Sequence, residues 1–551
     1  MSRRAKLTAV GIPLGLFLVA VAVRLWAAWQ FQLPPTENSA SYVGVARNLV
    51  EGRGLVSDAM WSYATPPLVF PKPAFEIWMP MGAFLAAVPM ALLGTTFAAA
   101  QLSSVLVGAA VAPLAWLVAL DAARRHGLDA RRTTGVALTA GLATAVVAPL
   151  VMAAAAPDST TPFTTLAVLA ALVVPGALRG SVRHAAALGG VLSLAYLSRQ
   201  ETIWLAAAFM ILLVPAIRRA AAVVQGGGRA LTVRALAPTV AVGGLMTAPW
   251  WLRNLAAFGS ITPSQAIENA WLTRNEEIFA YADRPDAATF LAQGPATIAG
   301  NIAAALGINL VDALLLPAAP LTLLGLIALP FLRRSPALRG ASPLLVVLVG
   351  GALMFVATAV MFPIATRWGT FMHASGPAIV GLIVVAALGA DAAVARVGRA
   401  RGWATSNVVL PAVLLIGLAA PLTVLQITLL AGQTRATHDA LTTAIADLAR
   451  QPELADPRRP VITDRPIYLA EGARRPTLAL PDESPGDVGR LADDFGAPLV
   501  LMLGERGRYP DAFADSGSGG VCFRERTATG PTNGTAPRHR IFVVLPGCGT
   551  R

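Results

Sequence analysis

The chain has 551 residues, of which 55% are hydrophobic and 13% are charged. Soluble domains carry about 25% charged residues, so this composition excludes a disordered, fibrous or typical soluble protein. A net charge of +13 would suggest nucleic-acid binding in a soluble chain, but the basic residues here lie in short gaps between apolar runs. With two cysteines, the chain also excludes a disulfide-rich scaffold and a four-cysteine zinc site.

Apolar runs recur from the N-terminus to about residue 430. A helix that crosses a bilayer needs about 20 mostly apolar residues. The first run, Leu7 to Trp29, is too long for a secretory signal and lacks the small-residue cleavage site, so we predict an uncleaved first span. The pattern predicts eleven spans, of which the fifth and sixth are short: 7–29, 95–120, 134–156, 160–178, 184–198, 202–217, 235–252, 313–332, 343–363, 373–395 and 406–430.

The charge of the gaps predicts how these spans are oriented, because basic residues are enriched in cytoplasmic loops. If Met1 is cytoplasmic, 19 basic residues and three acidic ones lie in six inner segments: 1–6, 121–133, 179–183, 218–234, 333–342 and 391–405. We therefore predict a multi-pass protein of the plasma or inner membrane with a cytoplasmic N-terminus.

The same count assigns the segment 77–94 to the outer face, because a span there would turn the arginine-rich loops outward. Its two prolines and the flanking Trp78 fit an interfacial or re-entrant helix. Two outer loops are then long, 31–94 and 253–312, and the second contains an expected interfacial helix near 288–308.

After Leu430 the chain becomes polar and rich in proline and glycine. Strand-like apolar runs cover 460–463, 497–503 and 541–545, and a helical pattern covers 487–495. We predict a transmembrane domain over 1–430 and a small extracytoplasmic α/β domain over 431–551. The latter contains both cysteines, Cys522 and Cys548, for which we favour a disulfide over two unpaired thiols. The expected fold class is a polytopic α-helical membrane protein of about 11 transmembrane helices, with outer interfacial helices and this small domain.

Polar side chains that could take part in catalysis or binding concentrate on one side of the predicted bundle. The predicted topology places eleven of them at the outer ends of spans or in outer loops: Glu37, Asn38, Lys72, Glu76, Asp158, Arg199, Glu201, Arg253, Asn254, Arg367 and His373. A transporter is expected to have ionisable groups near the middle of the membrane. The one-sided arrangement instead indicates an active site at the surface of the outer leaflet.

Several short motifs follow one another along this side of the chain. Glu37 comes just after the first span and begins a short amphipathic helix that ends at Gly52-Arg53-Gly54, a C-cap signal. The later motifs are Pro71-Lys72-Pro73 with Glu76, Pro157-Asp158 with Thr161-Pro162-Phe163, Tyr196 to Glu201, Pro249 to Asn254, and Arg367 to His373. In order and sidedness they resemble the integral-membrane glycosyltransferases of the C superfamily, which include protein O-mannosyltransferases and the lipid A aminoarabinose transferase. The resemblance covers roughly 8–395, with an echo at Asp464-Arg465-Pro466.

This resemblance implies an inverting glycosyltransferase, a hexosyl- or pentosyltransferase, that moves a sugar from a polyprenyl-phosphate carrier to a cell-envelope acceptor on the outer face. Glu37 stands where the family has its catalytic Asp, and Asp158 matches the second outer acidic site, so these two are the catalytic candidates. The substrate-binding candidates are Asn38, Lys72, Glu76, Arg199, Glu201, Arg253, Arg367 and His373. Membrane lipid is an expected partner, and nucleic acid is not.

Alternatives stay open for the site and for the function. We predict no required cofactor, although a divalent cation held by Glu37 and Asp158 is an alternative, because oligosaccharyl transferases of this superfamily use one. Each candidate also has a structural interpretation, such as helix capping by Asp158 or ion pairing between Lys72 and Glu76. Where the family usually has an acidic pair, this chain has Glu37-Asn38, so a catalytically silent member is one alternative and a lipid or sugar transporter or flippase is another.

Overall fold

The computed structural model describes residues 3–403, 407–504, 511–513, 520–526 and 539–548. Residues 1–2 and 404–405 of the predicted inner segments and residue 406, where a predicted span begins, lie outside these ranges. The contacts divide the chain into two compact units. Unit 1 consists of Met1–Gln32, Trp78–Trp251 and Ile302–Leu429, and unit 2 consists of Leu33–Ile77, Leu252–Asn301 and Leu430–Arg551.

Unit 1 is helical. Its elements in chain order are α1 (Arg3–Trp29), α3 (Met81–Leu93), α4 (Phe97–Ala109), α5 (Val111–His126), α6 (Ala130–Val146), α7 (Ala148–Ala155), α8 (Thr160–Leu178), α9 (Val182–Ser198), α10 (Thr202–Val223), the π-helix η2 (Asn309–Leu315), α15 (Leu321–Leu332), η3 (Pro336–Leu338), α16 (Pro343–Met361), η4 (Ala365–Trp368), α17 (Thr370–Ala374) and α18 (Gly376–Ala400). Three helices have residues in both units: α11 (Gly227–Phe258), α14 (Pro295–Ile308) and α19 (Leu410–Ala449).

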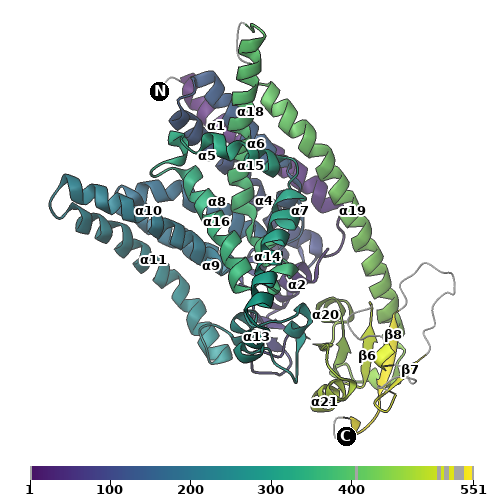
Figure 1. The fold of residues 1–551 in the computed structure, drawn as a ribbon. Helices are drawn as coiled ribbons and strands as arrows, with labels where there is room; N and C mark the ends of the chain where they lie inside the picture. Colours follow the sequence, from purple (N-terminus) through teal and green to yellow (C-terminus); the bar gives the residue numbers. More distant parts are fainter. Residues whose placement is uncertain (1–2, 404–406, 505–510, 514–519, 527–538, 549–551) are drawn as a thin grey trace. The chain divides into compact units, whose positions relative to one another are not determined.

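Helix α18 lies in the centre of unit 1 (Figure 1). It packs against α15, α16, α6 and α8, and every residue from Gly376 to Leu388 is buried. Small residues allow this close approach, since a Cβ atom added at Gly325 of α15 would lie 2.3 Å from the carbonyl oxygen of Leu382. Helices in lipid associate through such backbone proximity, because burying apolar surface against another helix gains little over burying it in lipid.

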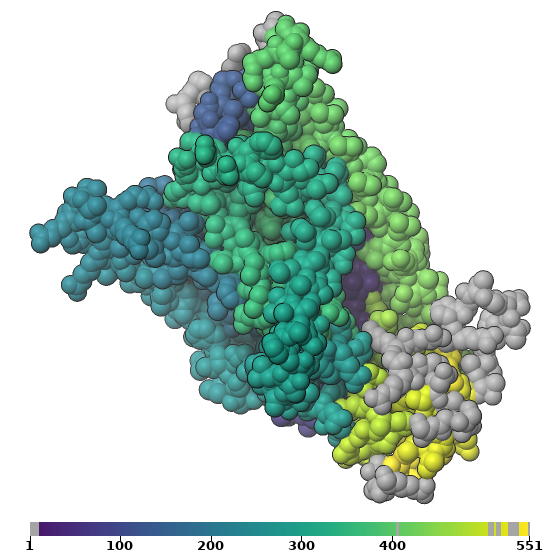
Figure 2. Space-filling model, viewed as in Figure 1, coloured from purple at the N-terminus to yellow at the C-terminus, as the bar shows by residue number. Residues whose placement is uncertain are grey.

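Nine helices among the described residues are long and apolar enough to cross a membrane, or ten if α6 and α7, bent by 47°, form one broken span. The protein is therefore a multi-pass membrane protein, as predicted. Large apolar side chains on these helices remain exposed, such as Ile203 on α10 (62%) and Leu245 on α11 (76%). Figure 2 shows the surface of these two helices in blue at its left edge. An exposed apolar surface of this kind fits contact with lipid.

These nine or ten helices compare with the eleven spans that the sequence predicted, and two regions account for the difference. The segment predicted as a span over 184–198 is α9, whose 17 residues make it shorter than the nine long helices. The next helix is longer than predicted, because α10 continues past Arg218 and Arg219 to Val223.

The stretch between 288 and 332 also differs from the prediction. The predicted span 313–332 contains Pro317 and Pro320, and the structure has only the 12-residue helix α15 there. Proline lacks the backbone N–H that a continuous helix needs, so the preceding helix ends before these residues. The 21 residues of α14 and η2 instead have the length of a span, in a region where we expected only an interfacial helix.

Unit 2 contains a mixed sheet and short helices. Its elements are α2 (Glu37–Val50), β1 (Val56–Ser57), β2 (Ala59–Met60), β3 (Lys72–Pro73), α12 (Ser264–Glu268), η1 (Asn275–Phe279), α13 (Ala287–Ala292), η5 (Pro452–Leu454), β4 (Val461–Thr463), α20 (Pro466–Ala473), β5 (Thr477–Ala479), α21 (Pro485–Phe495), β6 (Leu499–Met502), η6 (Asp511–Phe513), β7 (Phe523–Arg526) and β8 (Arg540–Val544).

The sheet has the strand order β2-β5-β4-β6-β8-β7, parallel from β2 to β6 and antiparallel beyond. Strands β4, β6 and β8 and helix α21 confirm the α/β character that the apolar runs predicted. Strand β2 was missed, because its two residues lie more than 400 positions before their partner strand β5 and show no pattern of their own.

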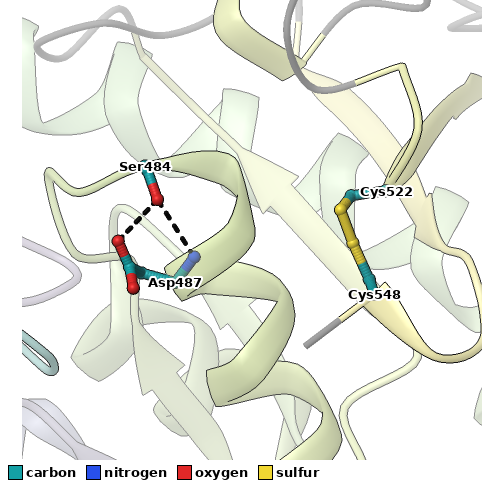
Figure 3. The surroundings of a disulfide bond; sticks show 4 residues. All are labelled: Ser484, Asp487, Cys522 and Cys548. Atoms are coloured by element: carbon teal, nitrogen blue, oxygen red, sulfur yellow. Dashed lines mark hydrogen bonds between the residues drawn. A yellow bond between two sulfur atoms is a disulfide. The ribbon is translucent and has the colours of Figure 1, made fainter. Parts of the chain in front are cut away.

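A disulfide joins Cys522, next to β7, to Cys548, after β8 (Figure 3). The bond lies against α21, where a Cβ atom added at Gly489 would be 2.9 Å from the Sγ atom of Cys548. Figure 3 also shows the start of α21, where the Ser484 hydroxyl accepts a hydrogen bond from the backbone N–H of Asp487 at 3.2 Å. The N-cap stabilises the start of α21, and the disulfide holds the segments next to β7 and β8 together.

Candidate functional site

Four of the predicted site residues converge in unit 1. Asp158 lies between α7 and α8, Arg199 and Glu201 lie between α9 and α10, and His373 lies in α17. With Thr160, the first residue of α8, they form a hydrogen-bonded group that we call the histidine cluster. Three turns that are far apart in the sequence thus contribute to one polar group.

Asp158 and His373 meet through a threonine. The Oδ1 atom of Asp158 accepts a hydrogen bond from the backbone N–H of Thr160 at 2.7 Å, and Oδ2 accepts one from the Thr160 hydroxyl at 3.0 Å. The same hydroxyl lies 2.9 Å from Nδ1 of His373, and that nitrogen lies 3.5 Å from Oδ2 of Asp158. Asp158 is 7% exposed and therefore faces its own helix start and the imidazole rather than solvent.

Arg199 connects the turns of the cluster. Its guanidinium pairs side-on with Glu201, at 3.2 Å from Nε to Oε2 and 2.5 Å from Nη2 to Oε1. The same group donates to the hydroxyl of Ser159 at 3.0 Å and to the carbonyl of Thr370 at 3.4 Å. Because Ser159 adjoins Thr160 and Thr370 lies one turn before His373, these bonds hold the two parts of the cluster together. A planar guanidinium with several donors suits such a junction.

Two glycines lie on either side of α17. A Cβ atom at Gly376, the first residue of α18, would clash with the hydroxyl of Thr164 in α8, one turn after Thr160. Gly369, just before α17, has φ = 101°, a conformation that favours glycine, and a Cβ atom there would lie 3.3 Å from the His373 ring. Glycine at 376 thus lets the start of α18 approach α8, and glycine at 369 leaves room beside the imidazole.

Arg367, predicted to bind phosphate, lies in η4 six residues before His373, and its side chain is exposed. An anion can reach an exposed guanidinium, so its position is compatible with the predicted role. Its role stays a prediction, as do those of Arg199 and Glu201.

Glu37, the predicted base, is the first residue of α2 in unit 2, where Thr36 caps the helix. Its Oε1 atom accepts a hydrogen bond from the backbone N–H of Ile467 at 3.3 Å, at the start of α20. Its Oε2 atom lies 3.7 Å from Nη1 of Arg465. Both contacts favour an ionised carboxylate, since a helix start and a guanidinium each attract negative charge.

The residues around Glu37 fix α2 against α20. Helix α2 can approach because residue 44 is glycine, where a Cβ atom would clash with the Glu471 carboxylate. Burial raises the pKa of Glu471, although Arg47 forms an ion pair with it at 2.5 Å. Asn38, beside Glu37, has a buried Oδ1 atom without a hydrogen-bond partner among the described residues.

The position of Arg465 depends on the preceding residue, Asp464. Asp464 is 5% exposed and accepts hydrogen bonds at 2.9 Å from the backbone N–H groups of Leu503 and Gly504. These bonds attach the segment before α20 to the end of β6, and thereby fix where Arg465 leaves the sheet. The sequence had marked this Asp-Arg-Pro segment only as an echo of the family, because its contact with Glu37 spans 428 positions.

Lys72 and Glu76 form a buried ion pair, with 2.7 Å between Nζ and Oε2. Lys72 is 1% exposed and also donates to the carbonyl of Ser62 at 2.8 Å, while Glu76 is 8% exposed. Burial lowers the pKa of Lys72 and raises that of Glu76, and the opposite charge of each partner counteracts this. The pair lies in β3 and the following loop, before the helix α3, which begins at Met81.

Arg253 contacts backbone rather than solvent in unit 2. Its Nη2 atom donates to the carbonyl oxygens of Ala74 at 2.7 Å and Leu55 at 3.4 Å, and its guanidinium lies 5.0 Å from the ring centre of Phe258. The neighbouring Asn254 donates to the carbonyl of Ile261 at 3.1 Å. These contacts tie the loop that carries β1 and β3 to the end of α11. Any role in phosphate binding stays a prediction.

A cavity of about 580 Å³ lies in unit 2 between the segments 273–289 and 482–487, and carboxylates dominate its lining. Several of these carboxylates have structural partners. Glu483 accepts hydrogen bonds from the backbone N–H groups of Tyr281, Ala282 and Asp283 at 2.9–3.0 Å, and Asp482 pairs with Arg274 at 2.7 Å. The acidic lining therefore reflects, in part, the bonds that join these two segments.

No group of three or more His, Cys, Asp or Glu residues is arranged to hold a metal ion in the described part of the chain. Asp158 already accepts two hydrogen bonds from Thr160, and Glu37 already faces a backbone N–H and a guanidinium. The oxygen-rich ligand set that a divalent ion requires is thus not assembled around either carboxylate.

The comparison with protein-family models and the comparison with curated proteins gave no match. Among solved structures, ArnT from Cupriavidus metallidurans bound to undecaprenyl phosphate is similar, with a TM-score of 0.55 and 14% identity over 98% of this chain and 99% of that one. The archaeal oligosaccharyltransferase AglB from Archaeoglobus fulgidus, in complex with an inhibitory peptide and a dolichol-phosphate, has a TM-score of 0.56 and 15% identity over 91% of this chain and 70% of that one.

A third similar structure is the Archaeoglobus fulgidus oligosaccharyltransferase in complex with Zn and sulfate, with a TM-score of 0.54 and 14% identity over 89% of this chain and 67% of that one. The chain thus has the fold of these membrane glycosyltransferases, and the predicted resemblance is confirmed at the level of the fold.

Proposed function

We propose that the protein is an inverting glycosyltransferase that moves a sugar from a polyprenyl-phosphate carrier to a hydroxyl acceptor of the cell envelope. The observation that carries this proposal is the likeness of fold to ArnT along nearly the whole of both chains, in a structure that contains undecaprenyl phosphate. AglB, the other similar protein, is bound to a dolichol-phosphate, so a lipid phosphate recurs among proteins of this fold.

Glu37 is the proposed base. Its carboxylate begins a rigid, capped helix, is 15% exposed, and is oriented by the start of α20 and by Arg465. An ionised, oriented carboxylate with residual access is what proton transfer from an acceptor hydroxyl requires. The buried pair of Lys72 and Glu76 has less access than Glu37 has.

The reaction proceeds by a single displacement at the anomeric carbon. The acceptor oxygen forms a bond to this carbon from the face opposite the phosphate, while the bond between the carbon and the phosphate oxygen breaks. The bonding electrons leave with the polyprenyl phosphate, and the acceptor proton passes to Glu37. A cation near the departing oxygen stabilises the negative charge that develops there, and the exposed Arg367 is the proposed cation.

The proposal includes a topology. We place the N-terminus in the cytoplasm of a plasma or inner membrane and the region 431–551 outside it. The charge count of the loops supports this orientation, and a disulfide between Cys522 and Cys548 suits an oxidising compartment.

The test uses the full chain in lipid nanodiscs with a panel of polyprenyl-phosphate sugars and an envelope extract as acceptor. The measured quantity is the release of polyprenyl phosphate by the wild type, by Glu37→Gln and by Glu51→Gln. Glu51 is a matched control, since it is an exposed glutamate at the opposite end of the same helix.

We expect Glu37→Gln to lower the rate by about 10²–10⁴-fold, the usual contribution of a general base, and Glu51→Gln to leave it unchanged. Full activity of Glu37→Gln would remove Glu37 as the base. Donor binding without release by the folded wild type would favour a silent member of the same fold, a result that Asn38 in place of the family's second acidic residue would explain.

A further inference from the structure

We propose that His373 presents an unprotonated Nε2 atom as the hydrogen-bond acceptor for a sugar hydroxyl, and that Thr160 and Asp158 are positioning residues that fix this tautomer. The identity of the ligand as a sugar rests on the proposed function, whereas the tautomer follows from the contacts of the histidine cluster alone.

The direction of the hydrogen bonds decides the tautomer. The Thr160 hydroxyl has one proton and two neighbours, the Oδ2 atom of Asp158 at 3.0 Å and the Nδ1 atom of His373 at 2.9 Å. An ionised carboxylate only accepts hydrogen bonds, so the hydroxyl proton points to Asp158. The hydroxyl oxygen then accepts, and Nδ1 of His373 carries the proton that it needs. In a neutral imidazole the other nitrogen, Nε2, is left as an acceptor.

A second contact favours the same assignment. Nδ1 of His373 lies 3.5 Å from the Oδ2 atom of Asp158, and this negative charge stabilises a proton on the nearer nitrogen. The opposite tautomer would aim the lone pair of Nδ1 at the hydroxyl and leave Oδ2 of Asp158, a residue only 7% exposed, without the hydroxyl proton. Burying an acceptor without its donor is unfavourable.

Access distinguishes the histidine from its two partners. The His373 side chain is 23% exposed, whereas Asp158 is 7% and Thr160 is 8% exposed. Of the three side chains, the imidazole is therefore the most accessible to a ligand. Gly369, against the ring, and Arg199, which bonds to the segments on both sides, keep the imidazole in place.

The tautomer specifies the chemistry of the ligand. A bare Nε2 atom accepts a hydrogen bond from a hydroxyl and repels the oxygens of a phosphate dianion, which are acceptors themselves. The cluster is thus a hydroxyl-binding subsite. The phosphate of the carrier would instead contact an arginine, for which Arg367 is the candidate. The hydroxyl comes either from the donor sugar or from the acceptor, and the kinetic experiment below separates these two sources.

The direct test measures the tautomer by ¹⁵N NMR on the full chain, labelled at histidine, in nanodiscs at neutral pH. The chain has five histidines, and His373→Gln identifies the signals of this one by their loss. Thr160→Ser keeps the hydroxyl, and Thr160→Val removes it at nearly equal size. We expect the Nδ1-protonated form in the wild type and in Thr160→Ser, and a mixture of the two tautomers in Thr160→Val. A wild-type His373 protonated on Nε2, or on both nitrogens, would overturn the proposal.

The functional test measures KM for the donor and KM for the acceptor in the same variants. We expect Thr160→Val and His373→Gln to raise one of these constants by about tenfold, the value of one lost hydrogen bond of about 1.4 kcal/mol, and Thr160→Ser to stay within about twofold. A rise in the donor constant assigns the hydroxyl to the donor sugar, and a rise in the acceptor constant assigns it to the acceptor. No rise in either constant would overturn the subsite. Absence of turnover in the wild type would refute the proposed function instead, and the tautomer could still be read by NMR.

Discussion

Two ion pairs in unit 2 show how differently the fold treats residues that looked alike in the sequence. Lys72 and Glu76 lie 2.7 Å apart and are 1% and 8% exposed, and they are close neighbours in the chain. Glu37 and Arg465 lie 3.7 Å apart, with side chains 15% and 38% exposed, and 428 positions separate them. Both pairs contain residues of family-like motifs at the outer side of the predicted topology.

This difference in burial indicates which pair chiefly stabilises the fold and which is accessible to a substrate. A buried pair satisfies its own charges, and removing one partner leaves the other buried and uncompensated. A partly exposed pair contributes little stability, because water screens it. We therefore assign Lys72 and Glu76 chiefly to folding and Glu37 with Arg465 chiefly to chemistry. Substitutions of Lys72 and of Arg465 test this assignment.

The largest effect is expected for Lys72→Met. It leaves the Glu76 carboxylate buried without its cation, which costs about 3–5 kcal/mol of unfolding free energy. The measurement is the unfolding of the full chain in nanodiscs, followed by tryptophan fluorescence. The double variant Lys72→Met/Glu76→Met is the control and should regain most of the loss, because apolar side chains of similar size replace a buried pair at little cost. A stable double variant with no transferase activity would show instead that the pair contacts substrate.

A smaller effect on stability, with a clear effect on activity, is expected for Arg465→Ala. The exposed pair contributes less than about 1 kcal/mol to folding. The rate of polyprenyl phosphate release should nevertheless fall by about tenfold, which corresponds to about 1.4 kcal/mol of lost orientation of Glu37.

Arg458→Ala is the matched control for Arg465→Ala. Arg458 lies seven residues before Arg465 and forms an exposed ion pair with Asp456. Arg458→Ala should change neither quantity. If Arg465→Ala and its control have equal activity, Arg465 does not position Glu37.

The smallest effect is a pH dependence at Glu483, a buried carboxylate that forms no ion pair within the part of the chain that the structure describes. Burial raises its pKa, against the three backbone N–H groups that lower it. A raised pKa means that the folded state favours the protonated form, so this contribution to stability is present below the unfolded pKa and is lost as the pH rises through the folded pKa.

The comparison for Glu483 is with Glu483→Gln, which keeps an acceptor and does not titrate. The stability of the wild type relative to this variant should decrease from acidic to neutral pH, by less than the loss in Lys72→Met. A relative stability that rises over this range would show that the backbone bonds outweigh burial.

Much of the fold was predictable because lipid imposes a simple pattern on a sequence. Apolar runs of the required length predicted a multi-pass helical protein, and short strand-like apolar runs after Leu430 predicted the small α/β region. The prediction failed where a local feature interrupts the pattern. Pro317 and Pro320 end a helix inside an apolar run, and the two residues of β2 are too few to show a period.

The sequence by itself determined the class of the protein, the chemical types of the site residues and their common side, because composition, hydropathy and charge are properties of a linear chain. Only the tertiary structure decided the partners. Thr160 meets His373 across 213 positions and Glu37 meets the start of α20 across 430, through glycines that allow the backbones to approach. Hydrogen bonds act over about 3 Å, so the role of each polar residue depends on which distant segment the fold brings within that range.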